Sequence, residues 1–128
     1  MTVKTLNAYL VALLITCCVG VAQTGQPGGN AVQTFSGEIM DDLCAKNKSH
    51  DKMMQQMKSM TSDPVVCTKK CVELGAHYVL YDRQKDAIYK LDNPQKAEPF
   101  AGKSVTISGT LAKNKIKIAS IEAAGGAK

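Results

Sequence analysis

The chain has 128 residues, with no tryptophan and only six tyrosines and phenylalanines together. A chain of this size forms one domain with a small hydrophobic core. The formal net charge is +5, but the lysines are spread along the sequence instead of forming a basic run. This distribution favours a solvated, mildly basic surface, and we expect no nucleic-acid partner.

The N-terminal residues are typical of a signal peptide. Lys4 precedes an apolar stretch at positions 10–19, which is too short to span a membrane comfortably. Small residues follow at Gly20 and Ala22, the two positions that a signal peptidase reads. We therefore predict a signal peptide over residues 1–22, with export of the mature protein to the periplasm or the extracellular space.

A second processing route is open for the same segment. Leu14-Ile15-Thr16-Cys17 resembles a bacterial lipobox, whose cysteine is lipidated and becomes the new N-terminus, although Thr16 is larger than the residue usual before that cysteine. By this route the mature protein would be anchored to a membrane through Cys17. By either route Cys18 has no role in the folded domain.

The folded domain is expected over residues 31–123, between a flexible leader at 23–30 and a flexible tail at 124–128. Residues 32–40 have the pattern of a β-strand, and Gly37 indicates a bulge or bend within it. The domain therefore begins with a strand, and in the next segments the apolar residues recur at the spacing of a helix.

Two short helices are predicted after this strand. The first covers residues 49–60, where Ser49 can cap the helix and the methionines recur at helical spacing as Met53, Met57 and Met60. The second covers residues 64–74. Asp63 can cap its start, Pro64 fits its first turn, and Gly75 fits the left-handed position that follows a helix.

After the second helix the apolar pattern changes to a period of two. Further strands are indicated at residues 77–81, 87–91, 104–111 and 116–121, with turns at 82–86 and 113–114. The fold class is therefore mainly β (α+β). We predict a small five-stranded barrel like the oligonucleotide/oligosaccharide-binding (OB) fold, or a curled antiparallel sheet, with the two helices inserted after the first strand. Gly37 and Gly109 would allow the sheet to curl.

Three cysteines remain once the signal peptide is removed: Cys44, Cys67 and Cys71. Cys67 and Cys71 are four residues apart, so they share one face of the predicted helix. Together with His50 the cysteines form a Cys3His set, which suits a tetrahedral zinc site. We therefore predict a site for a soft metal ion, zinc or copper, at these residues.

A disulfide is the alternative for the same cysteines, because exported thiols are oxidised unless something protects them. A bridge from Cys44 to Cys67 or Cys71 would staple the helical insertion onto the sheet and leave one spare thiol. A bridge within the helix, between Cys67 and Cys71, would be strained. In this interpretation the domain holds no metal and binds an oligomeric or protein ligand.

The methionines suggest a second way to bind metal. Thioethers prefer Cu(I), so Met53, Met57 and Met60 are accessory soft-metal ligands beside His50 in this hypothesis. Some periplasmic copper chaperones also use methionine and histidine ligands on a small β-barrel. The same spacing is also typical of the apolar face of a helix, where methionine fills irregular cores.

No catalytic constellation stands out, and we do not predict an enzyme. Asp41 and Asp42 could form an acid–base pair, but such acids more often bond to the next turn. His77 opens a strand and could reach the cysteines, although an exposed position is the simpler expectation. Three tyrosines could stack the units of an oligomeric ligand, although packing between strands is their commoner role: Tyr78, Tyr81 and Tyr89.

Several segments together resemble an uncharacterised family of small secreted bacterial proteins. The matching segments are residues 37–44, a histidine, Cys67-x3-Cys71, and residues 75–80 and 100–109, and they span nearly the whole mature domain. The most specific part is the order Asp-x2-Cys, His, Cys-x3-Cys. The resemblance implies a secreted β-barrel-like domain with a Cys/His cluster and no nameable activity. This chain departs from the family by a long methionine-rich insertion after His50, which leaves the place of His50 in the cluster open.

Overall fold

The computed structural model describes residues 31–56 and 63–125 of the chain. The strands are β1 (Gln33–Asp41), β2 (Tyr78–Asp82), β3 (Ala87–Leu91), β4 (Ser104–Ala112) and β5 (Lys115–Ala123). Three short helices separate β1 from β2: α1 (Asp42–Asn47), α2 (His50–Gln56) and α3 (Pro64–Glu73). Two 3-10 turns, Pro94–Lys96 and Glu98–Phe100, precede β4. No helix among these residues is both long enough and apolar enough to cross a membrane.

The five strands close into a barrel in the order β1-β2-β3-β5-β4, which confirms the predicted small five-stranded barrel. Neighbouring strands are antiparallel, except that β3 and β5 run parallel where the barrel closes. In that closing pair Leu91 lies opposite Ile116, and the backbone N–H of Asp92 donates to the carbonyl oxygen of Ile116 at 3.0 Å. The sheet is therefore mixed and not purely antiparallel.

The barrel encloses the larger hydrophobic core of the domain. Alternate residues of a strand face opposite sides of a sheet, and one set of alternate residues faces the interior. The buried members of this core are Phe35, Ile39, Leu80, Leu91, Ala97, Val105, Ile107, Ile116 and Ile118. Partly buried rings close it, and the ring centroids of Tyr89 and Phe35 are 5.6 Å apart.

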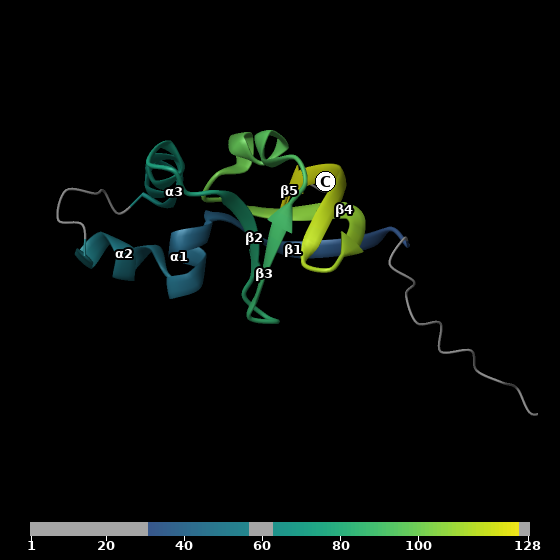
Figure 1. Cartoon of the computed structure of the whole chain (residues 1–128), viewed down its shortest axis with the longest axis horizontal. Helices are drawn as coiled ribbons and strands as arrows, with labels where there is room; N and C mark the ends of the chain where they lie inside the picture. Colours follow the sequence, from purple (N-terminus) through teal and green to yellow (C-terminus); the bar gives the residue numbers. More distant parts are fainter. Residues whose placement is uncertain (1–30, 57–62, 126–128) are drawn as a thin grey trace, which may run out of the picture.

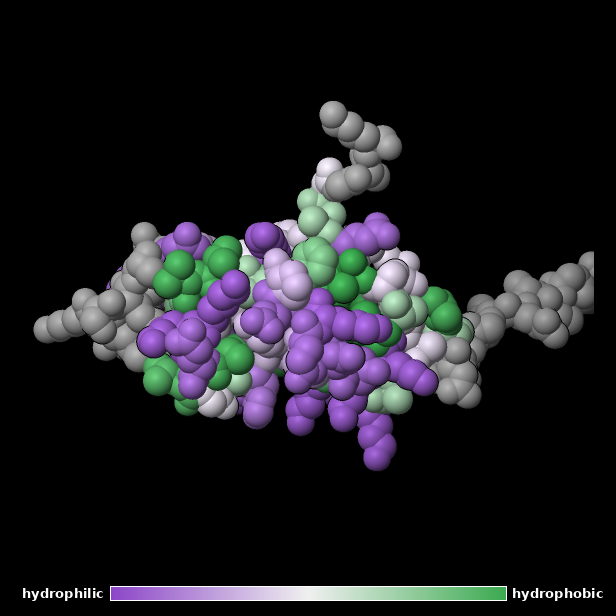
Figure 2. Space-filling view, turned by 90° about the horizontal axis from the view of Figure 1, so that it is seen from above, coloured by the Kyte–Doolittle hydropathy of each residue, from purple (hydrophilic) through white to green (hydrophobic). Residues whose placement is uncertain are grey.

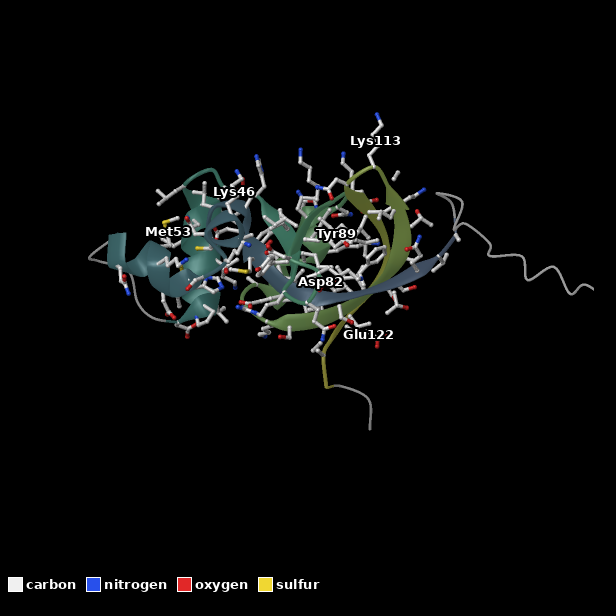
Figure 3. The ribbon with its side chains drawn as sticks, turned by 90° about the horizontal axis from the view of Figure 1, so that it is seen from below. Lys46, Met53, Asp82, Tyr89, Lys113 and Glu122 are labelled. Carbon is white, nitrogen blue, oxygen red and sulfur yellow. The ribbon has the colours of Figure 1, made fainter. Side chains whose placement is uncertain are left out.

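The three helices lie together at one end of the barrel, beside β1 and β2 (Figures 1 and 3). This contact gives β1 and β2 a second buried face. Ile39 and Leu80 pair with each other and face the barrel interior, whereas Met40 and Val79 pair with each other and face the helices. The outer face of these two strands therefore carries a second, smaller core.

The described part of the segment between β1 and β2 contains three helices where two were predicted, but the helices lie between the first two strands as predicted. The helix predicted over residues 64–74 is present as α3 (Pro64–Glu73), with Asp63 as its N-cap, Leu74 as its C-cap and Gly75 following at φ +105°. A further helix, α1, begins directly at the end of β1, where no helix was predicted. Residues 49–60 were predicted as one helix, and α2 accounts for His50–Gln56 of it. Met57 and Met60 lie outside the described residues.

Two glycines allow the strands to approach closely. At Gly109 the register of β4 against β5 shifts by one residue, so this glycine marks a β-bulge. Gly37 was predicted as a bulge or bend, but the register of β1 is regular on both sides of it. Its role is close approach, because a Cβ at this position would lie 2.5 Å from the carbonyl oxygen of Tyr81.

We therefore predict that Gly37→Ala destabilises the domain by about 1–3 kcal/mol, the usual cost of an extra carbon in a packed site. The neighbouring Ser36 is exposed on the same strand, so Ser36→Ala should change the free energy of unfolding by less than about 0.5 kcal/mol. Urea unfolding of both variants measures the difference. Equal stabilities would contradict the close approach of β1 and β2 at this point.

Candidate metal centre

The candidate site lies in the second core, between the helices and the outer face of β1 and β2. Cys44 comes from α1, and Cys67 and Cys71 come from α3. All three side chains are at most 2% exposed, and they pack with Met40, Ala45, Val79 and Tyr81. The three cysteines predicted to act together therefore do meet, from segments separated by more than twenty residues.

The end of β1 sets the position of Cys44. Asp41 is the N-cap of α1, and its Oδ1 accepts a hydrogen bond from the backbone N–H of Cys44 at 2.9 Å. A capping carboxylate satisfies an N–H of the first helical turn that has no partner inside the helix. Asp42 then ties this turn to the start of β2, because its Oδ1 accepts from the backbone N–H of His77 at 2.9 Å. Both carboxylates therefore accept hydrogen bonds from backbone N–H groups, at Cys44 and His77.

Helix α3 presents the other two thiols. The Oδ1 of Asp63 accepts hydrogen bonds from the backbone N–H groups of Val65 and Val66, at 2.8 and 3.4 Å. Cys67 and Cys71 are four residues apart, so they lie on the same face of this helix, as predicted, and both are buried. The start of the helix packs closely on the loop before β4, where a Cβ at Gly102 would lie 2.5 Å from the backbone nitrogen of Val65. This packing holds both thiols against the barrel.

The three thiols lie at distances that suit metal coordination. Their sulfur atoms are all within 4.8 Å of one another, and Sγ of Cys44 is 3.8 Å from Sγ of Cys67. Two sulfurs bound to one tetrahedral zinc at the usual 2.3 Å are separated by about 3.8 Å, whereas a disulfide needs about 2.05 Å. All three described cysteines are free thiols. The structure therefore has no disulfide at bonding distance in the part of the chain that it describes.

A second group of donors meets at Cys44. One ligand atom each from Asp41, Cys44 and His50 lie within 4.8 Å of one another, and all three residues are buried. Two buried atoms of this group, Oδ2 of Asp41 and Nδ1 of His50, have no hydrogen-bond partner among the residues that the structure describes. Buried polar atoms are almost always bonded, so these two atoms beside one thiol are available to a cation or a hydrogen-bond donor.

His50 is held by a carboxylate on its other nitrogen. Its Nε2 lies 2.9 Å from Oε1 of Glu38, and Oε2 of Glu38 accepts a hydrogen bond from Arg83 at 3.2 Å. A histidine that binds metal usually donates its second N–H to such a carboxylate, which fixes the ring and the tautomer. When Nε2 carries the proton, Nδ1 has a free lone pair, as a metal ligand requires.

The electrostatics of the site favour the neutral thiols in the absence of a cation. Burial, with the Asp41 carboxylate beside it, raises the pKa of Cys44 far above its ordinary value. Burial and the same carboxylate raise the pKa of Cys71 to about 11. Glu38 behaves in the opposite way: burial alone would raise its pKa, but the hydrogen bond and charge of His50, and then Arg83, lower it. A metal ion would reverse the cost of forming thiolates, because it supplies the compensating charge.

The other residues singled out in the sequence lie elsewhere or have packing roles. Met53 is partly buried against the second core, on the helical side of the molecule (Figure 3). His77 is exposed and belongs to neither donor group. The tyrosines do not share one open face: Tyr78 and Tyr89 pack against the barrel core, and Tyr81 is buried in the second core with its hydroxyl donating to Asp86 at 3.1 Å. Met57 and Met60 are not among the described residues.

One contributor to the site was missed in the sequence, and another was recognised only in part. Asp41 was noted as the first residue of the Asp-x2-Cys motif but not as a metal ligand, and its carboxylate caps α1 and also faces Cys44. Glu38 was given no role in the cluster. The one sequence feature that could have indicated a role for Glu38 is the period of two along β1, which puts Glu38 and Met40 on the same face of the sheet. Nothing local in the sequence shows that this face is covered by helices.

The structure also gathers lysines that the sequence spaces apart. Hydrophilic side chains are concentrated over the central part of one face, beside apolar side chains at the helical end (Figure 2). On the barrel, four lysines and Asp92 line an open groove of about 650 Å³: Lys90, Lys113, Lys115 and Lys117. Lys113 belongs to the turn between β4 and β5, well away from Met53 and the helices (Figure 3).

Comparisons of this chain with protein-family models, with curated proteins and with solved structures find no match.

We predict that the reduced, metal-free protein loses stability as the pH rises from about 9 to about 11. The folded state keeps the proton of Cys71 up to a pKa of about 11, whereas the unfolded chain releases it near the ordinary value of 9.0. Over this interval the unfolded chain binds fewer protons, so the free energy of unfolding falls with pH. Urea unfolding across the interval measures the fall.

Cys71→Ala is the matched comparison, because it removes this thiol and leaves the burial of its neighbours largely intact. Its stability should fall less steeply with pH than that of the unsubstituted protein. Identical slopes for the two proteins would show that Cys71 titrates normally in the folded state.

Proposed function

We propose that this protein is an exported module that binds a soft metal ion, with zinc as the first candidate, through its buried Cys/Asp/His cluster. The observation that carries the proposal is the convergence of three buried thiols with a sulfur–sulfur distance of 3.8 Å between Cys44 and Cys67. That distance equals the edge of a zinc–thiolate tetrahedron, and it is nearly twice the length of a disulfide bond.

The surroundings of the thiols support a metal over a structural bridge. A disulfide from Cys44 to Cys67 would use two of the three sulfurs and leave Cys71 buried as a spare thiol. It would also leave Nδ1 of His50 and Oδ2 of Asp41 without partners among the described residues. Metal binding would engage all three thiols in the group Cys44, Cys67 and Cys71, and it would engage these two atoms in the group Asp41, Cys44 and His50. Metal binding thus accounts for more of the buried polar atoms than one bridge does.

The donor set favours zinc, with copper as the competing ion. Thiolates accept both zinc and Cu(I), but a carboxylate and an imidazole beside them suit the harder of the two ions, which is zinc. Met53 packs against the second core, so a thioether is also available near the cluster for Cu(I). Export of the chain, by cleavage after Ala22 or by lipidation at Cys17, is part of the proposal and rests on the N-terminal pattern.

We predict that the reduced protein binds one or more divalent cations and that cobalt gives the intense absorption of thiolate-to-metal charge transfer. The chain for this test carries Cys17→Ser and Cys18→Ser, so that thiols outside the cluster do not contribute. Loss of an outer partner of a metal ligand typically costs 10–100-fold in affinity, so the loss of a direct ligand should cost more than about 100-fold. Cys44→Ser, Cys67→Ser and Cys71→Ser should each show this loss in a competition titration with a chromophoric chelator.

Lys69→Ser is the matched control, because Lys69 lies between the two cysteines on α3 and is exposed. It should bind zinc as the parent chain does. A cysteine variant with unchanged zinc affinity would contradict the metal site. A parent chain that is isolated from an oxidising compartment with a Cys44–Cys67 bridge, and that takes up no metal after reduction, would instead support the structural disulfide.

A second candidate function is the binding of an anionic ligand in the four-lysine groove. In the described part of the chain, other lysines form ion pairs with nearby acids, as Lys46 does with Asp42. No such pair is formed by the lysines of the groove among the residues that the structure describes. Lys90 also lies directly opposite Lys115 in the closing pair of strands. Like charges opposite each other destabilise a sheet, so this arrangement favours a site for a small multiply charged anion.

We predict that inorganic triphosphate binds this groove and that its affinity falls as salt is added. The double substitution Lys115→Gln and Lys117→Gln should weaken binding about tenfold or more, because each lysine contributes a charge-assisted hydrogen bond. The double substitution Lys52→Gln and Lys69→Gln changes the net charge equally, at exposed positions on the helices. Calorimetric titration compares the two. Equal weakening in both would show that only the net charge matters.

A further inference from the structure

The donor atoms of the cluster form two sets, which share only one residue. The first set is Cys44, Cys67 and Cys71, and the second is Asp41, Cys44 and His50. Within each set the ligand atoms are within 4.8 Å of one another. Among the described residues no set of four such donors meets this distance, although five donors are present in one buried region. The arrangement therefore provides two three-ligand sites side by side, and no complete four-ligand site.

On this basis we infer that the cluster binds two divalent metal ions bridged by the thiolate of Cys44. This inference rests on the proposed metal-binding function and gives its stoichiometry. The first ion is held by Cys44, Cys67 and Cys71, and the second by Cys44, His50 and Asp41. Three protein ligands leave an open coordination position on a zinc ion, so each ion could also take water or a small ligand.

The charges of the cluster support two ions over one. Three thiolates and the Asp41 carboxylate carry four negative charges in a region that is almost completely buried. Two divalent cations balance them, whereas a single ion leaves two charges uncompensated. Uncompensated charge is very costly in a protein interior. Glu38 does not alter this balance, because Arg83 neutralises it through a hydrogen bond of 3.2 Å.

The atoms of the second set are prepared for a cation of their own. Oδ1 of Asp41 accepts a hydrogen bond from the backbone N–H of Cys44, and its Oδ2 has no partner in the described part of the chain. Nε2 of His50 lies within hydrogen-bond distance of Glu38, and its Nδ1 has no partner within residues 31–56 and 63–125. In each of these residues, a hydrogen bond to one atom fixes the side chain, and a second, buried atom can bind a metal ion. A single ion bound only by the three cysteines would leave both of these atoms unsatisfied.

The test is the number of zinc ions bound per chain. The full chain with Cys17→Ser and Cys18→Ser is reduced, loaded with zinc, separated from free metal by gel filtration and analysed for zinc and protein. We expect two zinc ions per chain. His50→Gln should reduce this to one and should keep the cobalt–thiolate absorption of the three-cysteine set. Asp41→Asn keeps an oxygen for the cap of α1, and it should also retain one tightly bound ion.

His77→Gln is the matched control, since it removes the other histidine of the chain, which is exposed and outside both donor sets. It should bind two ions. One ion per chain in the parent, whether or not His50→Gln removes it, would overturn the bridged pair and leave the proposed metal-binding function intact. No bound zinc in the parent would overturn both. If the circular dichroism spectrum shows that His50→Gln does not fold, the number of zinc ions bound by Asp41→Asn tests the second site instead.

Discussion

The burial of three thiols, a carboxylate and an imidazole on the outer face of β1 and β2 is the constraint on which this structure depends. A small barrel can bury only a limited core, and this one covers part of its outer surface with helices to gain a second. That second core is polar at its centre. It is stable only when its charged forms are avoided or compensated, and a bound metal ion would compensate them.

The same constraint couples the helices to the site. Helices α1, α2 and α3 have six, seven and ten residues, and isolated helices of such lengths are marginal in water. Their stability comes from capping by Asp41 and Asp63 and from packing against the barrel. A metal bound through Cys44 and Cys67 would join α1 to α3 across a loop of more than twenty residues. Binding free energy would then contribute directly to the folding of this end of the molecule.

Much of the fold could be predicted from local patterns. The alternation of apolar residues indicated all five strands, and Asp63, Pro64 and Gly75 marked α3 because each has a local role in starting or ending a helix. Helix α1 could not be found in this way, since its six residues are too few for a helical repeat of apolar residues to be visible. The cysteines were recognised by their spacing. Asp41 was recognised only as part of the Asp-x2-Cys motif, although its contact with Cys44 is local. Glu38 was not recognised as part of the site, because its contact with His50 depends on how the helices fold back onto β1. The lysine groove likewise depends on the parallel pairing of β3 with β5.

The most direct test of this account is the identity of the atoms around the bound metal. X-ray absorption spectroscopy at the zinc edge, on zinc-loaded protein with Cys17→Ser and Cys18→Ser, reports the neighbours of the ion and their distances. The account predicts sulfur neighbours at about 2.3 Å together with nitrogen or oxygen neighbours at about 2.0–2.2 Å. A spectrum with only nitrogen and oxygen neighbours would contradict it, because the three buried thiols would then take no part in binding.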